Sequence, residues 1–364
     1  PMAKYSDIKG FTVQTVSTDP AASAIAGASW SSGNTLNRGL SVSMVGAGAT
    51  NTAAIAAGGN VGGPPYTDVT NTESYDGSSW TESPDLNAAR NQSAGTPSAP
   101  YTSALYHGGG PVGVTSNESW NGASWTEVGE MNTARTNHMG AGESNTAAIT
   151  AGGETTPRPP AQSVNAEKWN GASWTEVSNL NEARRHTPGC GTSTAALLIG
   201  GDNDPGYTGD VEQWNGASWT EIAEINTARI MGAGTGTVTE GFLAGGRTPS
   251  KTGKAENYDG TTWTEVADMT TARASFTGAG VATSNLFAGG ETATAYTNAT
   301  EEFSAPSIFG KQIKGQLFYN STADAFKETI TDVPGGSWAT GENLPAARAS
   351  IIGAGTATAG LVFG

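Results

Sequence analysis

The chain has 364 residues, of which 51 are Gly and only 14% are charged, and its formal net charge is −15. Abundant Gly and Thr argue against a helical protein, because both residues weaken helices, and the acidic balance argues against nucleic-acid or anionic-membrane partners, which call for clustered Lys and Arg. The single cysteine, Cys190, excludes an internal disulfide, and no apolar run is long enough to predict membrane insertion.

The most informative feature of the sequence is a repeat of 44 to 50 residues. Each unit carries a Trp after Ser or Thr, an Arg eight to ten residues later, a glycine pair that closes an apolar run, and Glu-x-aromatic before the next Trp. The Trp residues are Trp30, Trp80, Trp125, Trp174, Trp219, Trp263 and Trp338. Four signals in one register favour a single large repeat architecture over two or three ordinary domains.

Each unit predicts four short strands. The segment after the Arg, such as 136–142, is small and Gly-rich and suits a crowded inner strand, and the next run, such as 147–151, ends at the glycine pair. Segments 166–169 and 172–177 then form a hairpin across Asn170-Gly171, for which we expect a type I′ turn with positive φ at both positions. Four strands per repeat predict the blade of a β-propeller, an all-β fold.

The two ends of the chain carry complementary parts of a unit. The seventh unit has Arg348, a Gly-rich strand and an apolar run but no outer hairpin, whereas the N-terminus offers strands around 11–16 and 28–31 without an inner pair. We therefore predict one domain over 1–364, with seven four-stranded blades, the last closed by two strands from each end. A six-bladed ring is the alternative, because Ile-Lys-Gly at 8–10 recurs six Trp intervals later.

Residues 306–336 form the only segment outside this repeat pattern and lengthen the last Trp interval. The segment contains the aromatic residues Phe309, Phe318 and Tyr319. We expect this insertion to project from the ring or pack on one face, and to dock onto a neighbouring protein.

The order of glycine pair, Glu-x-aromatic, Trp and Arg resembles the kelch repeat over about residues 30 to 364. Two sequence motifs of the units also resemble kelch-like repeat proteins of marine tailed bacteriophages, notably those infecting cyanobacteria: Asn-Thr-Ala-Arg and Asn-Gly-Ala-Ser-Trp-Thr-Glu. The stretch 315–322 adds to this resemblance. The resemblance implies a kelch-like β-propeller and a virion structural or appendage protein, a capsid decoration or tail fibre, made in the host cytoplasm.

The charged residues that occur once per unit are expected to be structural. We expect each Arg to form a bidentate ion pair, with atoms within about 3 Å, to a Glu of the same or an adjacent blade. An enzyme would break the pattern at one blade, so we assign no catalytic residue and expect no enzyme. The predicted pairs draw on Arg90, Arg135, Arg184, Arg229 and Arg273, and on Glu118, Glu167, Glu212, Glu256 and Glu301.

The sequence predicts neither a cofactor nor a metal site. The three histidines, His107, His138 and His186, occupy different places in their repeats, and Cys190 lies between two glycines as a buried small side chain. The loop at 202–204 carries two Asp that could hold Ca²⁺, although a solvated turn is the favoured interpretation.

The loops after the glycine pairs share no motif and should lie on one face of the ring. Binding residues are generally found on such variable loops. Tyr66, Tyr207 and Tyr296 in these loops are candidates to stack on sugar rings or to fill partner pockets. We expect a non-enzymatic virion structural protein that is attached to capsid or tail and presents these loops to a host-surface glycan or protein. A soluble bacterial kelch-type interaction scaffold is the alternative, and a channel-centred glycan-active enzyme is less favoured.

Overall fold

The computed structural model describes residues 14–16, 28–37, 44–61, 66–110, 112–155, 161–281, 283–305, 317–320, 325–328, 352–356 and 359–363. The chain separates into two compact units, one formed by residues 23–311 and the other by 1–22 with 312–364, where the sequence predicted a single domain. Every regular element in the described ranges is a β-strand.

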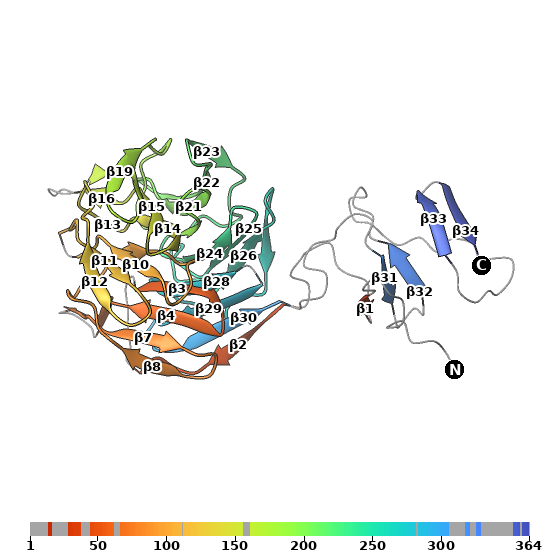
Figure 1. The fold of residues 1–364 in the computed structure, drawn as a ribbon, viewed down its shortest axis with the longest axis horizontal. Coiled ribbons are helices and arrows are strands. Elements are labelled where there is room, and N and C mark those ends of the chain that lie inside the picture. Colours follow the sequence, from red (N-terminus) through yellow and green to blue (C-terminus); the bar gives the residue numbers. More distant parts are fainter. Residues whose placement is uncertain are drawn as a thin grey trace. The chain divides into compact units, whose positions relative to one another are not determined.

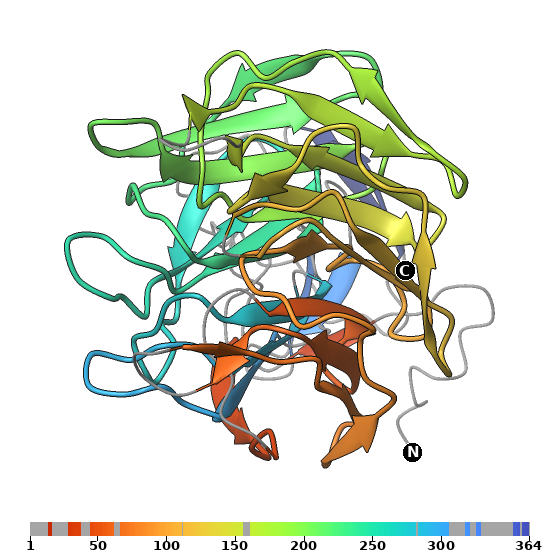
Figure 2. The ribbon, with the colours of Figure 1, turned by 90° about the vertical axis from the view of Figure 1, so that its left-hand side faces the viewer.

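The larger unit is a β-propeller of six four-stranded antiparallel sheets, whose blades follow one another round the ring in chain order (Figures 1 and 2). From the centre outward, blade 1 contains β3 (Val45–Thr50), β4 (Ala53–Ala57), β7 (Thr72–Tyr75) and β8 (Trp80–Ser83); blade 2, β9 (Ala94–Gly95), β10 (Ala104–His107), β11 (Asn117–Trp120) and β12 (Trp125–Val128); blade 3, β14 (Met139–Ser144), β15 (Ala147–Ala151), β18 (Ala166–Trp169) and β19 (Trp174–Val177). Blade 4 contains β20 (Gly189–Gly191), β21 (Ala196–Asp202), β22 (Tyr207–Trp214) and β23 (Trp219–Ile222); blade 5, β24 (Ala233–Thr237), β25 (Glu240–Ala244), β26 (Ala255–Tyr258) and β27 (Trp263–Val266); blade 6, β28 (Thr277–Val281), β29 (Ser284–Ala288), β30 (Thr300–Ser304) and β2 (Ser29–Gly33). Short pairings in the loops involve β5 (Asn60–Val61), β6 (Thr67–Asp68), β13 (Arg135–Thr136), β16 (Glu154–Thr155) and β17 (Ala161–Gln162).

The ring closes with six blades, so the seven-blade prediction with two strands from each end is wrong and the six-blade alternative holds. The N-terminal strand β2 is the outermost strand of blade 6, and Trp30 lies opposite Phe303 of β30. Trp174 lies opposite Trp169 in the same way in blade 3. Trp30 therefore fills the last place of blade 6 instead of opening a seventh blade, as Figure 1 shows with β2 beside β30.

The inner strands are held close together by one glycine per blade. A Cβ added to Gly140 would lie 2.4 Å from the carbonyl oxygen of Gly95 in the preceding blade, and one added to Gly189 would lie 2.9 Å from that of Gly140. Such distances are too short for any side chain, so glycine is required where these backbones meet. The equivalent positions in the ring are Gly46, Gly95, Gly140, Gly189, Gly234 and Gly278.

The outer hairpins turn through four residues instead of the expected two. In blade 3, Trp169 pairs with Trp174, the side chain of Asn170 accepts hydrogen bonds from the backbone of the two residues that follow Gly171, and only Gly171 has positive φ. The type I′ prediction is therefore wrong, because the Asn side chain caps a longer turn. The hairpin still places two large aromatic rings together, with centroids 5.7 Å apart in this blade, in the core between blades.

The second unit contains two small sheets. Strand β1 (Gln14–Val16) pairs in parallel with β31 (Leu317–Asn320), which pairs with β32 (Ala325–Glu328). Strands β33 (Ile352–Thr356) and β34 (Ala359–Phe363) form an antiparallel hairpin of five residue pairs, as β28 and β29 do. The expected pairing of 11–16 with 359–364 is wrong, because β1 takes β31 as its partner. In the described part of the chain, no helix is long and apolar enough to cross a membrane.

Candidate binding face of the propeller

Five blades contain the same buried ion pair. The guanidinium of Arg135, which leads into blade 3, lies 2.6 Å from the carboxylate of Glu167 on β18, and both side chains are fully buried. The other nitrogen of the fork donates to the carbonyl oxygens of Gly152 and Asn165. The Arg thus ties the entrance of its blade to the second and third strands of the same blade. The other pairs are Arg90–Glu118, Arg184–Glu212, Arg229–Glu256 and Arg273–Glu301.

The carboxylate is shared between the Arg and an Asn, so the predicted bidentate geometry is wrong. Oxygen Oε1 of Glu167 accepts the guanidinium, while Oε2 accepts the backbone N–H and the side-chain amide of Asn132 at 2.7 and 2.9 Å. The same amide donates to the carbonyl oxygen of Trp174. Since both carboxylate oxygens of Glu167 already have a donor, its buried charge is matched without a second guanidinium bond. Burial lowers the pKa of Arg135, and the nearby Glu167 carboxylate opposes this shift.

The Arg residues of these ion pairs also connect one blade to the next. In blades 1 to 5, the second glycine of the pair donates its N–H to the carbonyl oxygen of the Arg that leads into the next blade, as from Gly153 to Arg184 at 2.7 Å and from Gly59 to Arg90 at 2.9 Å. The structure places the pair of blade 2 at Gly108 and Gly109, one residue earlier than the spacing of Gly109 and Gly110 suggests, because Gly109 makes this bond to Arg135. The repeated polar residues therefore form a continuous structural frame.

The same face of the ring carries a circle of residues that vary between blades. The residue two positions after the Arg has φ between 53° and 57° in five blades, a region that non-glycine residues rarely adopt. Each donates its N–H to the carbonyl oxygen of its counterpart in the preceding blade, at 2.7 to 3.1 Å where both are described. We call these five residues the mouth ring: Gln92, Asn137, His186, Met231 and Ser275.

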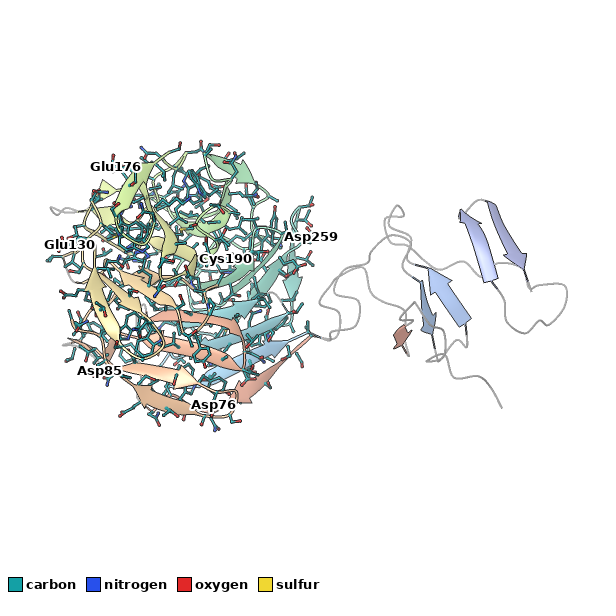
Figure 3. All side chains as sticks on the ribbon, in the orientation of Figure 1. Asp76, Asp85, Glu130, Glu176, Cys190 and Asp259 are labelled. Carbon is teal, nitrogen blue, oxygen red and sulfur yellow. The ribbon has the colours of Figure 1, made fainter. Side chains whose placement is uncertain are left out.

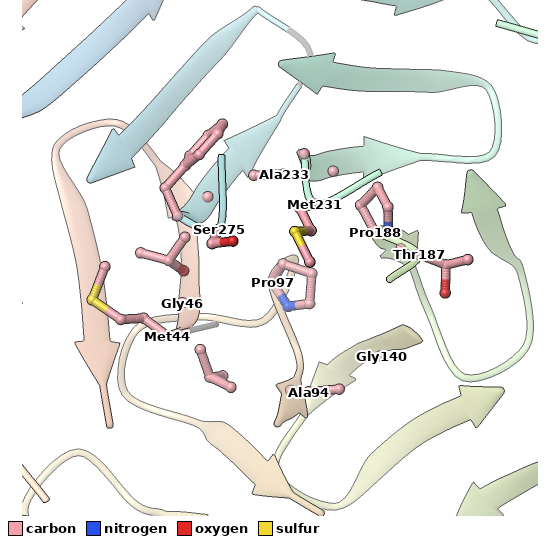
Figure 4. Close-up of a pocket in the computed structure, with 18 of the residues that line it drawn as sticks. Met44, Gly46, Ala94, Pro97, Gly140, Thr187, Pro188, Met231, Ala233 and Ser275 are labelled. Carbon is pink, nitrogen blue, oxygen red and sulfur yellow. The ribbon is translucent and has the colours of Figure 1, made fainter. Parts of the chain in front are cut away.

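Inside the mouth ring lies a cavity of about 120 Å³, which we call the central cup (Figure 4). All six blades line it, through the inner-strand glycines, four mouth-ring residues and neighbours such as Thr187. Its lining contains backbone, hydroxyl, amide, imidazole and apolar groups, but no Asp, Glu, Lys or Arg among the described residues. In Figure 4, Met231 and Pro97 both project toward the middle of the ring.

The far end of the channel is crossed by one loop. Blade 2 joins its inner two strands by residues 96–103, whereas blades 1 and 3 use two-residue turns. The hydroxyl of Ser98 in this loop donates to the carbonyl oxygen of Gly236 in blade 5 and accepts the N–H of Gly191 in blade 4. The loop thus reaches blades that are not its neighbours, and it makes the central cup a closed-ended site that opens on the side of the mouth ring. The sequence analysis did not predict this crossing loop, although two Pro residues in 96–103 exclude an ordinary tight turn.

Two histidines meet between blades 2 and 3, which the sequence did not suggest. Nε2 of His138 lies 3.2 Å from Nδ1 of His107, and both rings are buried. Desolvation lowers the pKa of His107 to about 3 and that of His138 well below its usual value, so both are neutral at pH 7. Most other blades have Ala at the position of His107. Among the described residues, no three metal-ligating side chains gather into a group that could hold an ion.

The loop candidates differ in their surroundings. Tyr66 is 52% exposed and packs edge-to-face against Tyr296 of the neighbouring blade, with ring centroids 6.1 Å apart. Tyr207, expected in a loop, is the exposed first residue of β22 in blade 4. In the loop considered for Ca²⁺, Asp202 forms an ion pair of 2.9 Å with Arg185, which also pairs with Glu154. Arg185 thus occupies an oxygen that the loop would offer to an ion.

The remaining candidates are placed as follows. Phe318 and Tyr319 lie in β31 of the second unit, and Phe309 lies outside the described residues. Cys190 is buried in the inner strand of blade 4, and burial raises its thiol pKa to about 12.

The periphery of the ring is acidic. The outermost strands of blades 1 to 5 each expose a Glu two residues after the Trp, such as Glu176 in blade 3. Figure 3 shows Glu176, with other acidic residues such as Asp85 and Asp259, at the edge of the propeller and Cys190 in its interior.

A comparison of the chain with known protein-family models and with curated proteins finds no match in either.

Proposed function

We propose that this chain is a non-enzymatic kelch-like structural protein of a bacteriophage particle, attached to the capsid or the tail. Its propeller presents the face with the mouth ring and the variable loops to a host-surface glycan or protein. The observation that carries this proposal is the separation of constant from variable residues. The Arg, Glu and Asn of the repeats are occupied by one another inside the blades, whereas the variable residues lie on one face.

The kelch assignment is supported by the roles of the repeated residues. The glycine pair joins one blade to the next, the Glu and Arg form the buried pair, and the Trp packs against the aromatic residue of the third strand. A non-enzymatic role is supported because the repeated charged residues, from which a channel-centred enzyme would draw its acids and bases, are buried in the frame.

The proposed attachment to the particle uses the second unit, with Phe318 and Tyr319 of β31 as docking residues, together with Phe309, which belongs to residues 23–311. A chain shortened to residues 23–311 should still fold as a propeller, with a β-sheet circular dichroism spectrum and a cooperative unfolding transition, because the blades and their closing strand all lie within that range. The shortened chain should no longer join the particle. Loss of folding would contradict the separate docking role.

Identification of the chain by mass spectrometry in purified phage particles tests the proposal directly. Its recovery in stoichiometric amounts would support a virion protein, whereas its presence only in the soluble fraction of the producing cell would favour the alternative, a bacterial interaction scaffold. Binding of the isolated propeller to host cells, and competition by soluble host glycans, then tests the presenting role.

A further inference from the structure

We propose that the central cup binds the uncharged end of a saccharide. The inference concerns a defined site within the ring and holds whether the protein acts on a particle or as a free scaffold. It rests on the charge, size, chemistry and accessibility of the cup.

The lining of the cup selects against charge. None of its described residues is Asp, Glu, Lys or Arg, so an ammonium, carboxylate or phosphate would lose water without gaining a counter-charge. The imidazole of His186 in the mouth ring is also neutral at pH 7, because desolvation lowers its pKa to about 4. The ligand group that enters the cup is therefore uncharged.

The cup offers both polar and apolar contacts to such a group. The backbones of the inner strands and the side chains of Asn137 and Ser275 provide donors and acceptors, while Met231 and Pro97 provide apolar surface. The hydroxyl of Thr187 is buried behind this lining and is not accessible from the cup. Alternating hydroxyl and C–H groups of a neutral sugar match this mixture, whereas a hydrocarbon would leave the polar atoms unpaired.

The volume of the cup sets the size of the group. Its 120 Å³ is somewhat below the roughly 150 Å³ of engineered cavities that take up benzene, so a group of about five or six non-hydrogen atoms fits. The crossing loop around Ser98 closes the far end, so that only the end of a larger molecule can enter from the mouth ring. Tyr66 and Tyr296 belong to loops on that same face and could contact the rest of a longer chain.

The test uses the full chain and three free sugars that differ mainly in charge: N-acetylglucosamine, glucosamine and glucuronic acid. Binding is followed by NMR of ¹³C-labelled methionine methyl groups, because Met231 projects into the cup whereas Met269 is buried in the core between blades. We expect a saturable shift of Met231, but not of Met269, with N-acetylglucosamine. A single sugar that buries few atoms should bind with a dissociation constant on the order of 1 mM.

The variant Ser275→Ala removes a side-chain hydroxyl that lines the cup. We expect its melting temperature to be unchanged and its affinity for N-acetylglucosamine to fall about three- to tenfold, the worth of one neutral hydrogen bond. The control Thr220→Val, on the exposed outer strand of blade 4, should change neither. The proposal is overturned if Met231 does not shift, if glucosamine or glucuronic acid binds as tightly, or if Ser275→Ala binds as well as the unaltered protein.

Discussion

Replacing Arg184 by Met removes one partner of a fully buried ion pair. In the unaltered protein, the guanidinium donates to Glu212 and to the carbonyl oxygen of Asp210 at 2.7 Å. The variant leaves a carboxylate with no exposed surface and only the Asn181 donors on its other oxygen. Breaking a buried pair in this way costs about 3–5 kcal/mol. For a chain of this size, that corresponds to a fall in melting temperature of roughly 4–7 °C.

The assay is thermal and urea denaturation of three proteins beside the unaltered chain. Lys254→Met is the matched control, because Lys254 pairs with Glu265 on the surface, where the two side chains are 39% and 52% exposed. Its cost should be at most about 1 kcal/mol. The double change Arg184→Met with Glu212→Gln should recover part of the loss, because a neutral amide can still accept the bonds from Asn181.

Two results would refute the reasoning. If Arg184→Met unfolds no earlier than Lys254→Met, the buried frame does not stabilise the ring. If the double variant is less stable than Arg184→Met alone, the loss does not come from an unmatched carboxylate, and the carbonyl contacts of the guanidinium would have to account for it.

Three further outcomes are expected. Gly140→Ala should lower the free energy of unfolding by roughly 1–3 kcal/mol, because its Cβ would lie 2.4 Å from the carbonyl oxygen of Gly95; in the same urea titration, Gly206→Ala, with no atom within 4 Å, should have almost no effect. The pKa of His107 is about 3 in the folded protein and about 6.5 in the unfolded chain. The stability that its neutral ring contributes is therefore fully present above pH 6.5 and is lost as the pH falls toward 3, because the unfolded chain takes up a proton first. Through His107 alone, unfolding at pH 5 should therefore cost about 2 kcal/mol less than at pH 7; His107→Ala should reduce the slope but leave the part that the lowered pKa values of His138 and His186 contribute. Trp30→Ala should cost about 3 kcal/mol in urea denaturation, because the ring closes through β2; an unchanged midpoint would contradict the six-blade closure.

The sequence predicts the blade better than the ring. Strand positions, the pairing of an Arg with a Glu and the glycine-rich inner strands follow from signals within one repeat, whereas the choice between the Glu of the same blade and that of an adjacent one does not. The number of blades does not, because Trp30 and Trp338 occur in the same local pattern and only the curvature of the sheets decides which strand lies beside Phe303. The meeting of His107 with His138 likewise depends on how adjacent blades pack, which no spacing within a repeat expresses.

The structure also explains why variation concentrates at the mouth ring. The bonds that join one blade to the next at this level run between backbone atoms, as from the N–H of His186 to the carbonyl oxygen of Asn137 at 2.7 Å. A bond of this kind constrains φ but leaves the side chain free, so Gln, Asn, His, Met and Ser all occupy the same backbone position. The Arg two residues earlier has no such freedom, because its side chain makes the bonds that hold the blade together. The propeller can therefore change the chemistry of its central cup one residue at a time without altering the frame that supports it.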